Sequence, residues 1–206
     1  MHDFTIKFVK NIRQIMTAPM LILFFVSTSK EVIILDVRRW IKIVEMIDNS
    51  DLVNLLHLLD EYPEFRNIYY YRIKKGNFIG FLLMQIIKLF YKECPSLFLN
   101  SNHIGSGLFI QHGFSTMVSA ESIGDNCWIN QQVTIGYNSQ KERPTIGNNV
   151  TINAGSKVIG KVTLNDNVTV GANAVVVKNV PNNCVVVGVP AYIVKRDGVK
   201  VKEQLI

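Results

Sequence analysis

A six-residue repeat of aliphatic side chains runs through the second half of this 206-residue chain. The aliphatic positions are Ile104, Ile110, Ile123, Ile129, Ile135, Ile146, Ile152, Val158, Leu164, Val170 and Val176. Four positions after most of these stands a second small or apolar residue, at Leu108, Phe114, Cys127, Val133, Val150, Ser156, Val162, Val168, Ala174 and Val180. A repeat at a fixed period is typical of a solenoid, in which each unit buries its inner face only against its neighbours.

Glycine and asparagine occupy the positions between the aliphatic residues, as in Gly124-Asp125-Asn126 and Gly171-Ala172-Asn173. Both residue types tolerate a positive φ at a tight corner. Three such corners close a three-sided coil of about eighteen residues, with one short parallel strand on each side. Residues 96–194 are therefore predicted to form a mainly-β domain, a parallel β-helix of about four coils. A β-sandwich would need alternating strands at wider spacing.

Residues 1–95 follow a different pattern, in which apolar residues such as Val37, Trp40 and Ile41 recur at helical spacing. An α-helical N-terminal region is therefore predicted. Its later helices are expected at Leu52–Leu59, Glu64–Lys75 and Phe78–Lys92, with a break and an N-cap at 48–51. Residues 195–206 are expected to form a basic C-terminal tail.

The composition excludes several classes of protein. Hydrophobic residues are 48% of the chain and charged ones 18%, which excludes a disordered chain. No apolar run is long enough to span a bilayer, and no clear signal peptide is present. Cys94, Cys127 and Cys184 lack the spacing of metal ligands or of a disulfide framework, so reduced thiols in a cytoplasmic protein and no metal are expected. The net charge of +6 favours an anionic partner, but no nucleic-acid motif accompanies it.

The segments Gly107–Gly113 and Val133–Gly136 resemble the left-handed β-helix acyltransferases. The match is best with the serine acetyltransferase branch, which includes capsule and colanic-acid acetyltransferases. The ending Gly188–Val194 looks like the closing segment of that branch. The resemblance covers residues 100–196. It implies a left-handed coil, acetyl-CoA as the acyl donor, and a homotrimer with active sites between neighbouring β-helices, in which trimers can also pair through the helical part.

Acetyl transfer to a hydroxyl group needs a base, and imidazole has a suitable pKa. Of the four histidines, only His112 lies in a hexad at the position that matches the family's catalytic base. A backbone carbonyl and Glu121 are the candidates for fixing its tautomer. Gln131 also stands two residues after an aliphatic position and, with Asn130, is a candidate to stabilise the oxyanion.

Two small residues, Ala154 and Ala172, occupy the same position of their hexads as His112 and Gln131. Coils stacked about 4.7 Å apart would place all four in one column, with His112 roughly 14 Å from Ala172. That distance matches an extended pantetheine arm, and Ala154, Gly155 and Ala172 match small residues that line the family's coenzyme A groove. Tight coil packing alone is the alternative explanation for these small residues.

Basic residues near the C-terminus are candidates to hold the coenzyme's phosphates, because lysine and arginine supply charge-assisted donors. Lys195 and Arg196 are the first candidates and Lys178 is a weaker one.

Three departures from the serine acetyltransferase pattern affect the acceptor. The family's aspartate directly before the catalytic histidine is Gln111 here, and the one fifteen residues before it is Leu97. Arg143 stands where a histidine of the acceptor loop is expected. We therefore predict an O-acetyltransferase for a sugar hydroxyl of a surface polysaccharide or its precursor, with Gln111, Gln131 and Arg143 as substrate contacts. The alternatives are a serine O-acetyltransferase and a non-catalytic β-helix scaffold.

The helical half suggests one further partner. Tyr69–Lys75 followed by the apolar stretch Phe78–Tyr91 would suit a peripheral contact with a membrane surface. Packing of these helices on each other and on a second trimer is the favoured interpretation.

Overall fold

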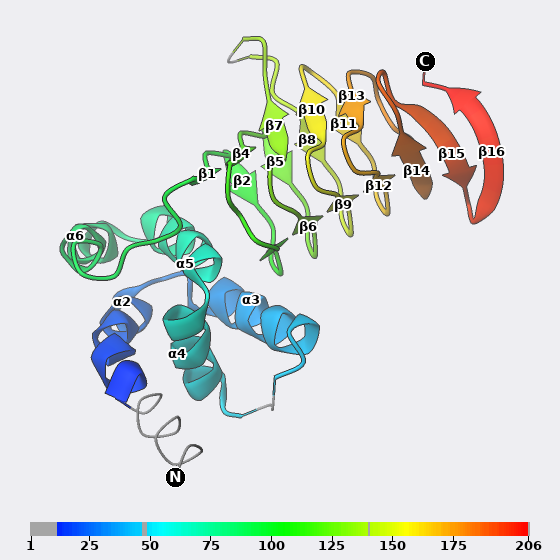
Figure 1. Cartoon of the computed structure of the whole chain (residues 1–206). Helices are drawn as coiled ribbons and strands as arrows, with labels where there is room; N and C mark the ends of the chain where they lie inside the picture. Colours follow the sequence, from blue (N-terminus) through cyan, green and yellow to red (C-terminus); the bar gives the residue numbers. More distant parts are fainter. Residues whose placement is uncertain (1–11, 47–48, 140, 206) are drawn as a thin grey trace. The chain divides into compact units, whose positions relative to one another are not determined.

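The computed structural model describes residues 12–46, 49–139 and 141–205, which fold as two compact units (Figure 1). The first unit, Met1–Cys94, is helical and the second, Pro95–Ile206, is built from short strands. Helix α6 ends at Ile87, and the first strand, β1, begins at Leu97. Among the described residues, no helix is long and apolar enough to cross a membrane.

The helical unit contains a short 3-10 helix, η1 (Ala18–Met20), and the helices α2 (Leu21–Val26), α3 (Lys30–Ile43), α4 (Asp51–Glu61), α5 (Pro63–Lys75) and α6 (Phe78–Ile87). Its core combines aliphatic and aromatic side chains, and the Trp40 ring on α3 meets the Phe65 ring on α5 edge-on, with centroids 5.2 Å apart. The Tyr69 hydroxyl donates to the carbonyl of Met20 at 2.9 Å. Helices α4 and α5 thus lie close to the predicted segments Leu52–Leu59 and Glu64–Lys75.

Helix α6 is shorter than predicted, because the sequence pattern extends to Lys92 but the helix ends at Ile87. After Ile87 the backbone tightens, and the amides of Leu89 and Phe90 donate to carbonyls only three residues back. The side chains of Leu89 and Phe90 are 70% and 77% exposed. Their hydrophobicity therefore does not reflect burial in this unit, and no packing favours further helical turns.

The second unit is a left-handed parallel β-helix of about five turns, one more than predicted (Figure 1). Its first three turns hold β1 (Leu97–Leu99), β2 (His103–Ile104), β3 (Phe109–Ile110), β4 (Thr116–Val118), β5 (Ser122–Ile123), β6 (Trp128–Ile129), β7 (Thr134–Gly136), β8 (Thr145–Ile146) and β9 (Thr151–Ile152). The last two hold β10 (Lys157–Ile159), β11 (Thr163–Leu164), β12 (Thr169–Val170), β13 (Val175–Val176) and β14 (Cys184–Val187). The extra turn arises because β1 and β14 lie outside the regular six-residue spacing.

Three sheets form the sides of the coil. The first has the order β1-β4-β7-β10-β13 and the second β11-β8-β5-β2, while the third begins β3-β6-β9-β12-β14. All eleven aliphatic positions of the repeat are at most 3% exposed, as predicted. The corners between the second and third sheets use asparagine with φ near +58°, at Asn126, Asn149, Asn167 and Asn183. Side-chain amides also pair from coil to coil, as when Asn167 donates to Asn183 at 2.9 Å.

One predicted core position is wrong. Phe114 is 46% exposed, because the chain takes eight residues rather than six from Ile110 to the next buried aliphatic residue, Val118. Val118 pairs with Ile135 in the neighbouring coil, and Thr116, which is 1% exposed, takes the inward position expected for Phe114. Two extra residues therefore bulge out at the corner that carries His112.

The segment from residue 195, expected to form a tail, is instead folded. Strand β15 (Tyr192–Arg196) pairs antiparallel with β14, and β16 (Val199–Gln204) pairs antiparallel with β15. These two strands extend the third sheet, and β16 is its outermost strand (Figure 1). The basic side chains of this segment therefore lie on an ordered hairpin.

Candidate active site

His112 lies on the bulge that follows β3. The ladder of the third sheet continues to Gln111, whose amide donates to the carbonyl of Ile129 at 2.9 Å. The backbone then leaves the regular path, with φ of 59° at His112 and 52° at Ser115. The imidazole is exposed, and it has no hydrogen-bond partner within the part of the chain that the structure describes. The imidazole on this protruding corner is therefore accessible from solvent.

The sequence predicts one column of His112, Gln131, Ala154 and Ala172. The structure stacks the last three residues but places His112 outside the column. The carbonyl of Gln131 accepts from the amide of Gly155 at 3.1 Å, and that of Ala154 accepts from Asn173 at 2.9 Å, which stacks Gln131, Ala154 and Ala172. The residue above Gln131 is Phe114, whose carbonyl accepts from the amide of Gln132 at 3.0 Å. His112 therefore stands two residues earlier, on the bulge, and not in the column.

The small residues nevertheless lie on the corner that carries His112. Ala154 and Gly155 follow β9 in the third coil, and Ala172 follows β12 in the fourth. Three ladder steps separate the coil of His112 from that of Ala172, which is roughly 14 Å. Ala154 and Ala172 thus lie on the same corner of the β-helix as His112, and Phe114 and Gln131 precede them in the column.

Gln111, which directly precedes His112 in the chain, and Asn130 share one hydrogen-bond partner. The indole Nε1 of Trp128 lies 2.7 Å from Oδ1 of Asn130 and 3.2 Å from Oε1 of Gln111. The Trp128 ring meets the Phe109 ring edge-on, with centroids 4.7 Å apart. Trp128 is not among the residues predicted for the site. It stands directly before an aliphatic residue, at a position that holds threonine in most later coils, and this unusual residue type could have indicated a role there.

Arg143 lies on a different corner of the same chain from His112. It belongs to the loop between β7 and β8, where its Nη1 donates to the carbonyl of Asn100 at 2.9 Å and its guanidinium lies 4.7 Å from the centroid of the Tyr137 ring. Glu121 is on that corner too: its amide donates to the carbonyl of Pro144, and Oε2 accepts from Asn102 at 2.9 Å. Neither Arg143 nor Glu121 is placed to orient His112 of its own chain.

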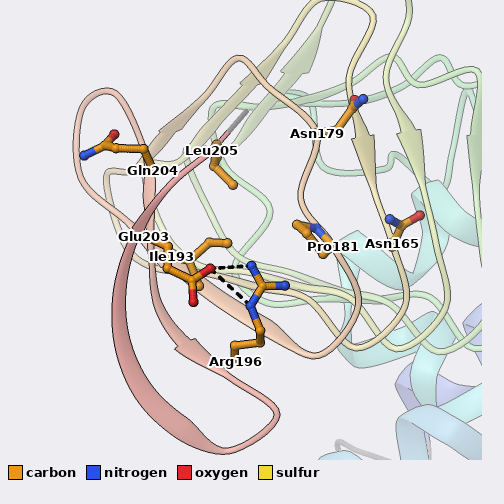
Figure 2. A pocket seen from close by; sticks show the side chains of 8 residues that line it. All are labelled: Asn165, Asn179, Pro181, Ile193, Arg196, Glu203, Gln204 and Leu205. Carbon is orange, nitrogen blue, oxygen red and sulfur yellow. Dashed lines mark hydrogen bonds and ion pairs between the residues drawn. The ribbon is translucent and has the colours of Figure 1, made fainter.

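The basic residues proposed for coenzyme phosphates are divided among further positions. Lys178 donates from Nζ to the carbonyl of Leu205 at 3.1 Å. Arg196 forms a two-pronged ion pair with Glu203, at 2.5 and 3.2 Å from one carboxylate oxygen (Figure 2). This hydrogen bond raises the pKa of Arg196 above its ordinary value. Lys195 is exposed on β15, opposite Lys200 of β16.

The Arg196–Glu203 pair borders a cavity of about 250 Å³ under β16, at the C-terminal end of the β-helix (Figure 2). Its lining also includes Asn165, Asn179, Pro181, Ile193, Gln204 and Leu205. Because the carboxylate of Glu203 already engages the guanidinium, Arg196 is less suited to phosphate binding than the sequence alone indicates. Within the described residues no cluster of His, Cys, Asp and Glu suits a metal ion.

Comparison with known proteins identifies the repeat. Residues 143–178 match the family model described as "Bacterial transferase hexapeptide (six repeats)". A serine acetyltransferase of Staphylococcus aureus (strain Mu50 / ATCC 700699) is 48% identical over 102 residues, which cover 48% of each chain. One from Synechococcus elongatus is 43% identical over 102 residues, 48% of this chain and 42% of the relative. The chain thus spans about half the length of the curated relatives it matches.

Two solved structures share the fold. The serine acetyltransferase of Neisseria gonorrhoeae superposes with a TM-score of 0.62 at 23% identity, over 84% of this chain and 68% of that one. The serine acetyltransferase of Brucella abortus strain S19 in complex with Coenzyme A gives a TM-score of 0.60 at 25% identity, over 83% and 69%. The predicted left-handed β-helix with a preceding helical region is therefore confirmed.

Proposed function

We propose that this hexapeptide-repeat protein transfers an acetyl group from acetyl-CoA to a hydroxyl group, with His112 as the general base. The observation that carries the proposal is the exposed imidazole on the corner of the β-helix that also carries the small residues Ala154, Gly155 and Ala172, in the third and fourth coils. A relative with the same fold has been solved with Coenzyme A. An extended pantetheine arm along this corner would bring the thioester to His112.

The reaction follows from these positions in one displacement. His112 takes the proton of the acceptor hydroxyl, and the oxygen attacks the thioester carbon. Hydrogen-bond donors beside His112 stabilise the negative oxygen of the tetrahedral intermediate. Coenzyme A leaves as a thiolate, which is a good leaving group because thiols have pKa values of about 8.5. The protonated His112 then gives its proton to this thiolate. No covalent acetyl-enzyme is needed, since Cys94, Cys127 and Cys184 are all buried.

L-Serine is the first acceptor to test, because the relatives are named serine acetyltransferases. A sugar hydroxyl is the second candidate. It is supported by Gln111 and Leu97, which replace the two carboxylates expected for an amino-acid acceptor. The comparisons favour the first candidate and the residues of this chain the second.

A homotrimer would complete the site. Phe98 and Met117 are 55% and 46% exposed on the outer face of the first sheet, and a neighbouring β-helix would cover them. The loop that carries Arg143 would then be supplied to His112 of a neighbour, and not of its own chain. The three cysteines are buried and unbridged, which suits the reducing cytoplasm that we propose as the location.

The test measures thiol release from acetyl-CoA with L-serine and with a panel of sugars as acceptors. Acceptor-dependent release by the wild type, lost in His112→Ala, is the expected result. His103→Ala is the matched control, because His103 is also an exposed histidine of the β-helix but lies on β2. Equal release by wild type and His112→Ala would contradict the assignment of the base.

A further inference from the structure

We propose that Trp128 is a positioning residue that holds the side-chain amides of Gln111 and Asn130 as a pair of hydrogen-bond donors for the acceptor. The pair would bind oxygen atoms of the acceptor and reject an ammonium group. This inference rests on the proposed acetyltransferase activity and specifies which acceptors the site takes.

The three side chains form one fixed cluster. Trp128 Nε1 is 2.7 Å from Asn130 Oδ1 and 3.2 Å from Gln111 Oε1. The indole ring is held in turn by the Phe109 ring, which is 5% exposed and packs edge-on against it. Gln111 and Asn130 occupy equivalent positions in adjacent coils, since the amide of Gln111 donates to Ile129 and that of Asn130 to Ile152.

Chemistry fixes which end of each amide faces the indole. A tryptophan N–H is a donor only, so the atom it meets on each neighbour must be the amide oxygen. The NH2 groups of Gln111 and Asn130 are therefore turned away from Trp128, and in the described part of the chain neither has a partner. Equivalent positions on adjacent strands are about 4.8 Å apart, so the two donors suit two neighbouring hydroxyl groups.

This arrangement selects between chemical classes of acceptor. An ammonium group needs hydrogen-bond acceptors or a negative charge around it, and none of the three side chains carries a charge. The one N–H of Trp128 is shared between the two amide oxygens, so both oxygens face the indole and the two NH2 groups are the ends left for an acceptor. Gln111 directly precedes His112 in the chain, so this pair lies at the corner of the β-helix that carries the proposed base. The geometry thus favours a sugar or a hydroxy acid over a free amino acid.

The experiment compares two acceptors of the same skeleton, glycerate and L-serine, which differ by a hydroxyl and an ammonium group. A panel of glucose and glucuronate extends the comparison to sugars. In the wild type we expect kcat/KM for at least one of the oxygen-only acceptors to exceed that for L-serine. In Trp128→Phe, which keeps the aromatic packing and removes the N–H, the amides are free to turn, and we expect this preference to fall about tenfold.

A purely structural role of Trp128 is separated by three further readouts. The KM for acetyl-CoA should stay within about twofold in Trp128→Phe, because the loss is confined to acceptor recognition. Phe109→Leu, which removes the ring contact but keeps the indole N–H, should retain the preference. Gln111→Asp, which adds a carboxylate, should shift the preference toward L-serine. An unchanged acceptor preference in Trp128→Phe would overturn the proposal.

Binding provides a readout that does not depend on catalysis. The chain has two tryptophans, so in Trp40→Phe the fluorescence reports Trp128 alone. We expect oxygen-only acceptors to change this fluorescence at lower concentration than L-serine does. Such binding without thiol release would contradict the proposed activity and leave the recognition site standing. Tighter binding of L-serine, or no response to any acceptor of the panel, would refute the recognition site itself.

Discussion

Asp36 and Arg72 form a buried ion pair in the helical unit, and we expect its disruption to be among the most costly single changes there. The carboxylate and the guanidinium are 1% and 4% exposed, and they share two hydrogen bonds of 2.8 and 3.2 Å. Arg72→Met removes the charged partner of a buried carboxylate, which typically costs about 3–5 kcal/mol. That loss is comparable with the total stability of a small domain, about 5–15 kcal/mol.

The surface pair Arg38–Asp51 is the matched control, because it has the same two-pronged geometry at 2.8 and 3.1 Å but is 64% and 34% exposed. Arg38→Met should cost less than about 1 kcal/mol. The double variant Asp36→Leu/Arg72→Met should recover most of the loss, since apolar groups replace buried ion pairs at little cost.

Urea unfolding followed by circular dichroism at a helical wavelength measures these free energies. Equal costs for the buried and the exposed pair, or additive costs in the double variant, would refute the argument that burial decides the outcome.

Three further predictions concern other parts of the chain. Burial raises the pKa of Tyr69 and Tyr70 above their ordinary values, so the helical unit should keep full stability below about pH 10. Above that pH it should lose about 1.4 kcal/mol per pH unit for each tyrosine, a slope that urea midpoints would measure and that Tyr69→Phe should reduce. In Gly124→Ala the new Cβ would lie 2.7 Å from the backbone of the next coil, so we expect a loss of about 1–3 kcal/mol in the free energy of unfolding. Gly136→Ala, whose new Cβ would have its nearest atom at 3.4 Å, should be nearly neutral, and thermal melts compare the two variants. Ile86 on α6 is 58% exposed, so Ile86→Glu tests whether trimers pair through the helical part. If they do, sedimentation velocity should show a trimer in place of the larger assembly, and an unchanged sedimentation coefficient would exclude this position of α6 from the contact.

The β-helix is predictable from the sequence wherever the spacing is strict. Each inward aliphatic residue must be buried by the coils above and below it, so the positions from Ile123 to Val176 identify themselves by period alone. The prediction fails at Phe114, because a hydrophobic residue at the expected spacing conceals a two-residue bulge. Only the register of Val118 with Ile135 shows that Thr116 points inward.

The ends of the β-helix were harder to predict for a different reason. Strands β1 and β14 pair with regular coils but lack the six-residue spacing themselves. The basic side chains from Lys195 onward suggest a solvated tail, yet lysine is also common on exposed edge strands. The formation of β15 depends on its register with β14, and the amino-acid composition does not reveal that register.

Part of the candidate site could also be predicted from the sequence, and part of it only from the structure. His112 and the small residues from Ala154 to Ala172 follow from the repeat and the family resemblance, and they lie on one edge of the β-helix. Trp128 was missed because its role comes from contacts across two coils, with Gln111 in one and Asn130 in the other. Arg143 was grouped with His112 from sequence, but a single chain places the two on different corners.

The antiparallel hairpin of β15 and β16 also bears on aggregation. A rod made only of parallel β-helix coils would expose unpaired backbone groups at the edge of its last coil. The first coil of another copy could pair with that edge, as strands do in a fibril. Here the outermost strand of the third sheet runs antiparallel to its neighbour and carries the exposed Lys200 and Lys202. Charged edge strands of this kind resist further pairing. At this edge the hairpin therefore opposes end-to-end polymerisation of the rod.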